Sequence, residues 1–288
     1  MQSFIWRRIN IDVPENWEML SYSTNFDNGR CYFGDRYQHR LMFRWRNITS
    51  EPDMKKMAVD YASYIGLRDD IVSVKPVSYY QWEGVEANLP DASYSSYSSF
   101  LASEKLLVEL IFLTPANSEN RQEQKILSSV SEEPLQLDHY RRWRAFGMDM
   151  VTDDRYTIRK CQVLPGFAEM TFNHLKDDNL YDTFERFGMV DEWLRGSIEE
   201  WVKKRIPDGV KIISSKVEEY RGHTFYTING KVNIGFSKLI RGARVEYIAR
   251  TWRCPIDGRL YCYSSIRNSN DNNQPEDLDR LHCCENLR

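Results

Sequence analysis

The sequence predicts an α+β protein made of two tandem copies of a mostly antiparallel sheet that is covered by helices. The first observation is internal similarity, because Trp6-Arg7 recurs as Trp143-Arg144 and a similar order of elements follows each pair. The second is that each copy contains an amphipathic helical segment between segments in which apolar and polar residues alternate. The third is that the alternating segments meet at tight turns, which favours antiparallel pairing.

Each copy opens with a predicted strand. Apolar residues alternate with others over 9–13 in the first copy and over 146–150 in the second. A period of two is typical of a strand with one buried face. In the first copy the segment "RLMFRW" (40–45) is expected to form a following strand.

A predicted helix follows in each copy. In the first copy it covers 53–65 behind Pro52, and in the second it covers 194–202 and stops at Pro207. The spacing i, i+3, i+4, i+7 places the apolar residues of each segment on one face of a helix. These residues are Met54, Met57, Ala58, Tyr61 and Ile65 in the first copy, and Leu194, Ile198, Trp201 and Val202 in the second.

Hairpins and a closing helix complete each copy. Gly84 and Gly222 each follow a strand that ends near an aromatic residue, and they mark tight turns. After further hairpin strands and a polar loop, "KILSSV" and "DRLHCC" are expected to form short terminal helices. The second copy carries extra residues near 229–242, which predict a longer loop or an added hairpin.

These elements set the expected domain boundaries. The first α+β repeat covers 1–131, the acidic stretch 132–138 is the linker, and the second repeat covers 139–288 with the insertion near 229–242. Because the linker is short, the two repeats are expected to touch.

The composition is that of a folded globular protein. Of the 288 residues, 41% are hydrophobic and 13% aromatic, and the net charge is −3. Such a balance provides no global field for nucleic acid or for an anionic membrane, so neither is expected as a partner. No apolar run is long enough to span a bilayer, and the start lacks the apolar core of a signal peptide. Six cysteines without a framework spacing suit a reducing compartment, which predicts a cytoplasmic protein.

The order of elements resembles the PsbP-like fold, which also includes DcrB-like bacterial domains. The resemblance depends on "INIDVPENW" as the opening strand and turn, on "RLMFRW", on the helix at 53–65 and on the closing loop and helix. The second half departs from it where "VPENW" becomes "VTDDR". The resemblance implies a layered sandwich in each half, and members with a known role mostly bind or stabilise other proteins. It transfers no functional residue, because no residue-level motif matches.

The C-terminal "HCC" raises the question of a metal or redox site. Zinc sites usually present CxxC or HxxxH pairs, and the sequence has neither. If "PIDG" is a four-residue turn, Cys254 faces Arg259 across the hairpin and Cys262 points to the opposite sheet face. A three- or five-residue loop would return the two cysteines to one face, but not directly opposite each other. The candidate ligands are Cys254, Cys262, His282, Cys283 and Cys284.

We interpret these cysteines as packing residues and expect no metal and no cofactor. On a helix, Cys283 and Cys284 would diverge by about 100° and would not readily share an ion. Cys284 would instead occupy the buried place that Val130 holds in the first copy, as a small hydrophobic residue. Metal binding at the C-terminal cysteines and His282 is kept as an alternative.

Four clusters interleave tryptophan and arginine: "IWRR", "FRWR", "RRWR" and "RTWR". Such clusters can bind single-stranded nucleic acid through stacking and phosphate contacts. On a strand, however, the tryptophan and the arginine alternate between the two faces. We therefore expect buried tryptophans covered by arginine side chains.

No catalytic residue is predicted. The sequence lacks HExxH, GxSxG, a P-loop and GxGxxG, so a non-enzymatic protein is favoured. His174 lies near Asp177, Asp178 and Asp182, and this group could bind a divalent cation or act in acid–base chemistry. A solvated loop has the same composition and is the favoured interpretation.

The expected function is therefore non-catalytic protein binding or scaffolding, with another protein as the partner. The contact surface would be the cleft between the halves or an exposed sheet face. "SYSSYSSF" (93–100) could form such a surface, or a polar edge strand. The alternative from another class is a small-ligand-binding protein or enzyme that uses the interdomain cleft, with 229–242 as a lid. Neither the identity of the partner nor the oligomeric state is indicated by the sequence.

Overall fold

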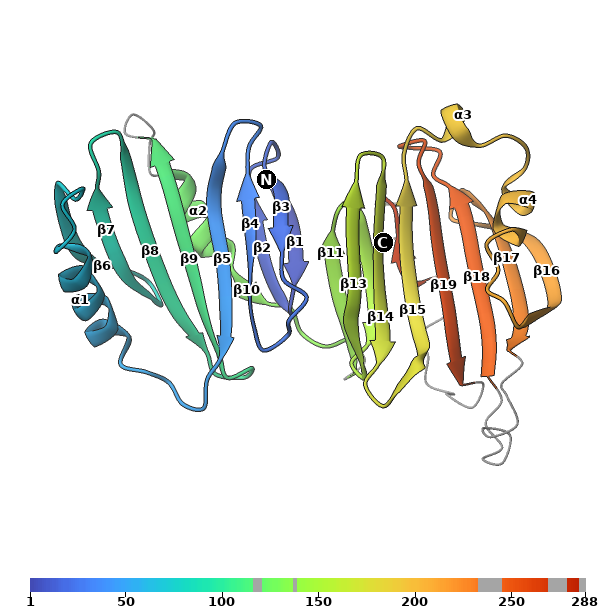
Figure 1. Ribbon diagram of the computed structural model, residues 1–288, viewed down its shortest axis with the longest axis horizontal. Coiled ribbons are helices and arrows are strands. Elements are labelled where there is room, and N and C mark those ends of the chain that lie inside the picture. The colour runs from blue at the N-terminus through green and yellow to red at the C-terminus, as the bar shows by residue number, and fades with distance from the viewer. Residues whose placement is uncertain (116–120, 137–138, 233–244, 269–278, 285–288) are drawn as a thin grey trace. The chain divides into compact units, whose positions relative to one another are not determined.

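The computed structural model describes residues 1–115, 121–136, 139–232, 245–268 and 279–284 (Figure 1). The chain divides into two compact units, unit 1 (Met1–Glu133) and unit 2 (Pro134–Arg288). Glu132, which the sequence places in a linker, belongs to a short strand of unit 1.

The structure is mainly β. Strands account for 58% of it and helices for 12%, with four helices in the described ranges. The prediction of an α+β sandwich whose sheets are covered by helices is therefore wrong. The helices cannot cover the sheets, because the strands of the hairpins have up to 11 residues whereas two of the helices have only four and six residues.

Unit 1 contains a seven-stranded antiparallel sheet with the order β3-β4-β5-β9-β8-β7-β6. Its strands are β3 (Glu18–Tyr22), β4 (Asn28–Gly34), β5 (His39–Asn47), β6 (Ser73–Tyr79), β7 (Trp82–Asn88), β8 (Ala92–Leu101) and β9 (Leu106–Pro115). Beside it, β2 (Ile9–Val13) pairs with β1 (Gln2–Trp6) and with β10 (Ser131–Glu132). The strand expected at "SYSSYSSF" is confirmed as part of β8.

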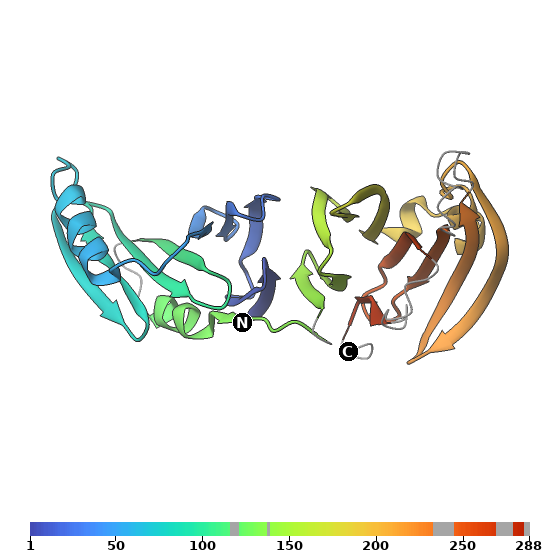
Figure 2. The same ribbon diagram turned by 90° about the horizontal axis from the view of Figure 1, so that it is seen from below.

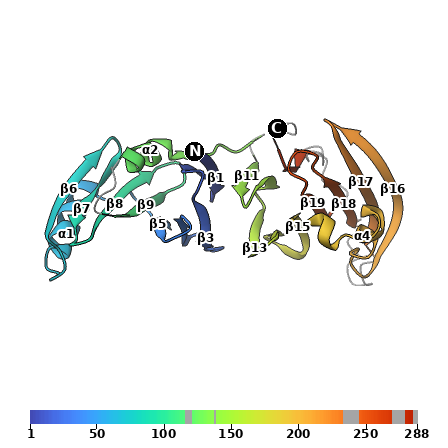
Figure 3. The same ribbon diagram turned by 90° about the horizontal axis from the view of Figure 1, so that it is seen from above.

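The two helices of unit 1 lie on opposite faces of this sheet (Figure 2). Helix α1 (Met54–Ile65) begins where the Asp53 side chain accepts a hydrogen bond from the Lys56 backbone N–H, as N-caps do. The helix lies beside β6 and β7 (Figure 3). Ala62 and Ile65 are buried in a cluster with Val85 and Ala87 of β7. Helix α2 (Arg121–Ser129) packs on the other face, where Ile126 and Leu127 are buried. The predicted helices at 53–65 and at "KILSSV" are confirmed.

Unit 2 repeats this strand order. Its seven-stranded antiparallel sheet has the order β13-β14-β15-β19-β18-β17-β16. The strands are β13 (Tyr156–Leu164), β14 (Phe167–His174), β15 (Asp177–Phe187), β16 (Val210–Tyr220), β17 (His223–Val232), β18 (Val245–Arg253) and β19 (Leu260–Asn268). Beside it, β12 (Met148–Asp153) pairs with β11 (Tyr140–Ala145) and with β20 (Leu281–His282). The matching order supports the duplication hypothesis, which stays a prediction.

Two predicted elements of unit 2 differ from the structure. The segment 194–202 is not one helix, because Gly196 has a φ of 108° and separates α3 (Val190–Trp193) from α4 (Ile198–Lys203). Ser197 then caps α4 by accepting a hydrogen bond from the Glu200 N–H. The prediction of a terminal helix at "DRLHCC" is also wrong, since β20 pairs there with β12. Residues 233–242 of the expected insertion lie outside the described residues, and 229–232 belong to β17.

The hydrophobic core of unit 2 includes a cluster between the sheet and α4. Ile228, Ala249 and Val202 are buried in it. No helix in the described part of the chain has both the length and the apolar character needed to cross a bilayer.

Candidate functional site

Three of the candidate cysteines meet in unit 2. Cys254, Cys283 and Cys284 lie beside His223, and the four ligand atoms are all within 4.8 Å of one another. His223 and Cys254 are buried, and Cys283 and Cys284 are half-buried. This Cys–His cluster consists of side chains from three separate segments of the chain.

Short distances connect the atoms of the cluster. The sulfurs of Cys283 and Cys284 are 3.7 Å apart. The Nε2 atom of His223 lies 3.3 Å from Cys283 Sγ and 3.5 Å from Cys284 Sγ. The other ring nitrogen, Nδ1, lies 3.1 Å from the carbonyl oxygen of Arg221.

A tight turn positions Cys254 directly after β18. Its N–H donates to the carbonyl of Arg259 at 2.9 Å, and its carbonyl accepts from the N–H of Gly258 at 2.9 Å. Gly258 has a φ of 70°, which favours glycine. Of the two alternatives left open by the sequence, the four-residue turn is the one observed, with Cys254 opposite Arg259.

Cys262 and His282 are not part of the cluster. Cys262 pairs with Thr251 in the sheet and contacts Glu185 on the other face, as expected for a four-residue turn. His282 belongs to β20 opposite Asp149, and its Nε2 lies 4.0 Å from Asp279 Oδ1. Burial lowers the pKa of His282.

The helical argument against a shared ion does not apply to Cys283 and Cys284. They follow the two-residue strand β20 rather than continuing a helix, so their side chains are not separated by the helical angle. The interpretation of "HCC" as a helix end is wrong.

Burial governs the chemistry of these thiols. It raises the pKa of Cys254 and Cys283, and that of Cys262 to about 12. Three sulfurs and one imidazole are a ligand set suited to a soft divalent cation.

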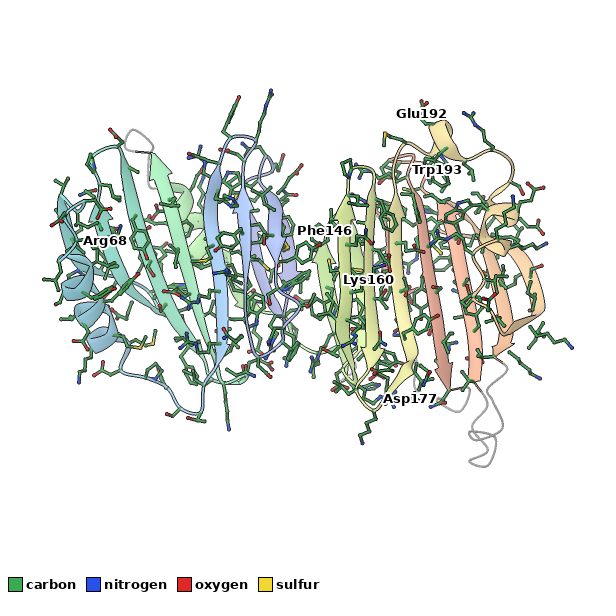
Figure 4. All side chains as sticks on the ribbon, in the orientation of Figure 1. Arg68, Phe146, Lys160, Asp177, Glu192 and Trp193 are labelled. Atoms are coloured by element: carbon green, nitrogen blue, oxygen red, sulfur yellow. The ribbon has the colours of Figure 1, made fainter. Side chains whose placement is uncertain are left out.

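The group around His174 does not converge. His174 lies at the turn between β14 and β15, where its Nδ1 accepts a hydrogen bond from the Lys176 N–H at 3.2 Å. Asp177 is at the same turn (Figure 4), whereas Asp182 is buried within β15 near the Tyr263 hydroxyl. Three strands separate β14 from β17 in the sheet, so His174 and His223 do not share a site.

The tryptophans of the Trp–Arg clusters are buried, as predicted. All four are buried, with exposed fractions of 1–2%. They are Trp6, Trp45, Trp143 and Trp252.

A second candidate site is a groove in unit 1 between α1 and the sheet. Its volume is about 390 Å³. Met54, Met57 and Tyr61 line it from α1, and strands β5, β7, β8 and β9 form its floor. The charged residues of its lining are Arg44, Asp60, Glu83 and Glu109.

The carboxylates of the groove have different partners. Glu109 accepts hydrogen bonds from Arg44 at 3.1 Å and from the Ser96 hydroxyl at 3.1 Å. Glu83 accepts one from the Ser78 hydroxyl at 2.5 Å. In the described parts of the chain, no cationic side chain pairs with Asp60 or Glu83. The groove therefore keeps an excess of negative charge.

The sequence missed the groove because the apolar stripe of α1 is wider than the surface through which the helix packs on the sheet. The predicted stripe combined residues that are buried, such as Ala58, with residues that are not. Met57 is 39% exposed and Tyr61 is 36% exposed, and the Tyr61 hydroxyl lies 2.8 Å from the Tyr94 hydroxyl. The unusual width of the apolar stripe was the one signal available in the sequence.

Comparisons with known proteins find similarity at the level of structure. No family model and no curated protein matches the sequence. Cyanobacterial PsbP (CyanoP) from Synechocystis sp. PCC 6803 matches with 12% identity over 48% of this chain and 86% of that one, with a TM-score of 0.35. The apo structure of TplEi, a T6SS immunity protein from Pseudomonas aeruginosa, matches with 6% identity over 95% and 88%, with a TM-score of 0.37. The Tle4–Tli4 complex matches with 8% identity over 95% and 89%, with a TM-score of 0.34.

The structural neighbours thus include an immunity protein and a PsbP-like protein. The predicted resemblance to the PsbP-like fold is confirmed as a weak fold-level similarity.

Proposed function

We propose that this chain is a non-catalytic protein-binding protein and that the groove of unit 1 receives a segment of its partner. The observation that carries the proposal is one edge of the apolar stripe of α1, where Met57 and Tyr61 remain exposed although the helix is packed on the sheet through Ala62 and Ile65. Both side chains line the groove, together with the half-buried Met54.

The lining of the groove suits a peptide segment. Methionine side chains are flexible and polarizable, so they adapt to different apolar partners. Tyrosine offers an apolar ring with a polar end, which is favourable at interfaces. A volume of about 390 Å³ is in the range of small binding pockets and accommodates a few side chains.

The charge of the groove indicates the chemistry of the segment. Asp60 and Glu83 add negative charge that no described cation offsets, while Arg44 and Glu109 offset each other. Electrostatic complementarity therefore favours a partner segment that carries lysine or arginine beside an apolar residue.

Two further parts of the proposal concern the whole chain. The equal strand order of the two sheets supports a duplication with repeats at 1–131 and 139–288. The six free cysteines support a reducing compartment such as the cytoplasm.

Selection from a displayed library of random peptides tests the groove. We expect the purified chain to enrich peptides that pair a basic residue with an apolar one. A selected peptide should bind the double variant Asp60→Asn/Glu83→Gln about 5- to 10-fold more weakly, because two partly exposed charge contacts of up to ~1 kcal/mol each are lost. Fluorescence anisotropy measures the affinity.

Matched variants test whether binding depends on the residues that line the groove or on other exposed residues near it. Met57→Ala should weaken the binding of the peptide. Val59→Ala should not, because Val59 is exposed on the same helix but lies outside the groove. Asp69→Asn is the control for charge, since Asp69 is exposed and outside the groove lining. Equal binding by all five proteins, or enrichment of acidic peptides, would show that the groove is not the contact surface.

A further inference from the structure

We propose that His223, Cys254, Cys283 and Cys284 form a tetrahedral zinc site in unit 2. The site supplies one nitrogen and three sulfur ligands, a combination typical of structural zinc centres. It is independent of the groove in unit 1.

The three distances among His223, Cys283 and Cys284 match the edges of a coordination tetrahedron, and the Cys254 sulfur lies within 4.8 Å of all three atoms. Bonds of ~2.3 Å to sulfur and ~2.0 Å to nitrogen imply edges of roughly 3.8 Å between sulfurs and roughly 3.5 Å between sulfur and nitrogen. The sulfurs of Cys283 and Cys284 are 3.7 Å apart, and the two sulfur–nitrogen distances are 3.3 and 3.5 Å. A cation can bind between these atoms with little rearrangement.

The histidine is oriented as a ligand. A carbonyl oxygen only accepts hydrogen bonds, so the contact with Arg221 places the ring hydrogen of His223 on Nδ1. In the neutral ring the lone pair then lies on Nε2, the atom that faces the sulfurs. Zinc-bound histidines usually have this kind of second contact, which fixes the ring and its tautomer.

Hydrogen-bond donors surround the sulfurs. The indole Nε1–H of Trp252 donates to Cys283 Sγ at 3.3 Å. The backbone N–H groups of Ile256 and Asp257 donate to the Cys254 sulfur from within the turn. Three thiolates and one divalent cation leave one negative charge, and such donors stabilise that charge in a buried site.

A disulfide explains the cluster less completely. A disulfide would join two sulfurs at ~2.05 Å, and it would leave the third sulfur and the lone pair of His223 without a function. All the cysteines of the chain are free thiols in this structure. The convergence of four ligand atoms is accounted for by an ion.

The site has a structural role as a clasp for the end of unit 2. In unit 1 the closing segment is helix α2, which buries Ile126 and Leu127 and accepts a hydrogen bond from Trp82 Nε1–H at 3.2 Å. In unit 2 the described part of the closing segment pairs through only two residues of β20. The ion would join residues 283–284 to β17 and to the turn after β18, and so replace the packing of the helix.

Metal analysis of the full-length, untagged protein purified under reducing conditions tests the site. Inductively coupled plasma mass spectrometry should find one zinc ion per chain. Cobalt(II) substituted for zinc should give the intense visible bands of a tetrahedral ion and the charge-transfer bands of thiolate ligands. Cys254→Ser, Cys284→Ser and His223→Asn should each lose stoichiometric metal.

Cys262→Ser and Cys161→Ser are the matched controls, because neither sulfur belongs to the cluster, and both should keep one zinc. If the ligand variants do not fold, the wild-type protein is treated with a chelator and titrated with cobalt(II). A reduced wild-type chain that binds no zinc and shows no thiolate–cobalt bands would overturn the proposal. Loss of the metal in the Cys262→Ser control, with the ligand variants still loaded, would overturn it as well.

Discussion

Replacing Arg280 by methionine is expected to lower the free energy of unfolding of unit 2 by about 3–5 kcal/mol. Arg280 is 2% exposed, and its Nη1 lies 3.7 Å from Asp182 Oδ2. Its guanidinium also lies over the ring of Tyr140, 5.3 Å from the centroid. The substitution keeps most of the volume but removes the cation that acts most strongly on the buried Asp182, and Arg267 is left as the weaker one. Urea denaturation combined with hydrogen exchange measures the loss for unit 2 separately.

The loss should depend on pH in a defined direction. Burial raises the pKa of Asp182, and the positive charge of Arg280 acts against this rise. Because the folded state then holds the proton more tightly than the unfolded state, stability falls as the pH rises from the unfolded pKa toward the folded one. Without Arg280 the folded pKa is higher still, so the variant should be more destabilised at pH 7 than at pH 5.

Two variants serve as controls for the Arg280–Asp182 pair. Asp182→Asn in the Arg280→Met background should restore much of the stability at pH 7, since the uncompensated charge is removed. Arg159→Met, at an exposed position of β13, should change the stability by less than about 0.5 kcal/mol. A loss that is equal at both pH values and is not relieved by Asp182→Asn would contradict the role given to the pair.

Trp82→Ala is expected to lower the stability of unit 1 by about 3–5 kcal/mol. Trp82 is 2% exposed, and its indole N–H donates to the carbonyl of Leu127 at 3.2 Å. The substitution opens a cavity on the face of the sheet that α2 covers, and it removes the bond that ties the helix to β7. Hydrogen exchange should increase in α2 and β7 before it increases in unit 2.

Trp82→Phe and Tyr80→Ala are the comparisons for this variant. The phenylalanine keeps most of the apolar contact, so it should cost less than the alanine. Tyr80 is 84% exposed, and its replacement should change the stability by less than about 0.5 kcal/mol. If Tyr80→Ala were as costly as Trp82→Ala, burial would not be the reason for the effect.

The elements that the sequence predicted correctly depend on local interactions. Helix α1 was predictable because its cap at Asp53 and its apolar spacing are contained in a few turns of chain. The turn after Cys254 was predictable because its loop length fixes which residues face each other. The burial of the tryptophans followed from strand alternation.

The errors arose where a local pattern competed with a longer-range one. The apolar spacing over 194–202 fits a helix, yet Gly196 adopts a left-handed conformation and Ser197 starts a new helix. Short amphipathic segments were taken as layers over the sheets, whereas long antiparallel hairpins form most of the structure. Whether residues 281–284 form a helix or a strand was decided by pairing with β12, which no local pattern reveals.

The Cys–His cluster could not be assembled from sequence motifs. His223 and Cys283 are 60 residues apart, and the register of the sheet brings them together. Cys262 and His282 were candidate ligands only in the alternative of a metal site, and strand alternation and pairing place them outside the cluster. The available signals were the "CPIDG" turn and the adjacent cysteines of "HCC".

Nuclear magnetic resonance of the methionine methyl groups tests the binding groove most directly. The chain has nine methionines, and Met54 and Met57 line the groove, whereas Met148, Met150 and Met170 are buried in unit 2. Titration with a selected basic and apolar peptide should shift the methyl signals of Met54 and Met57 and leave those three unchanged. Shifts in Met148, Met150 or Met170 without any change at Met54 and Met57 would contradict the proposal that unit 1 binds its partner through this groove.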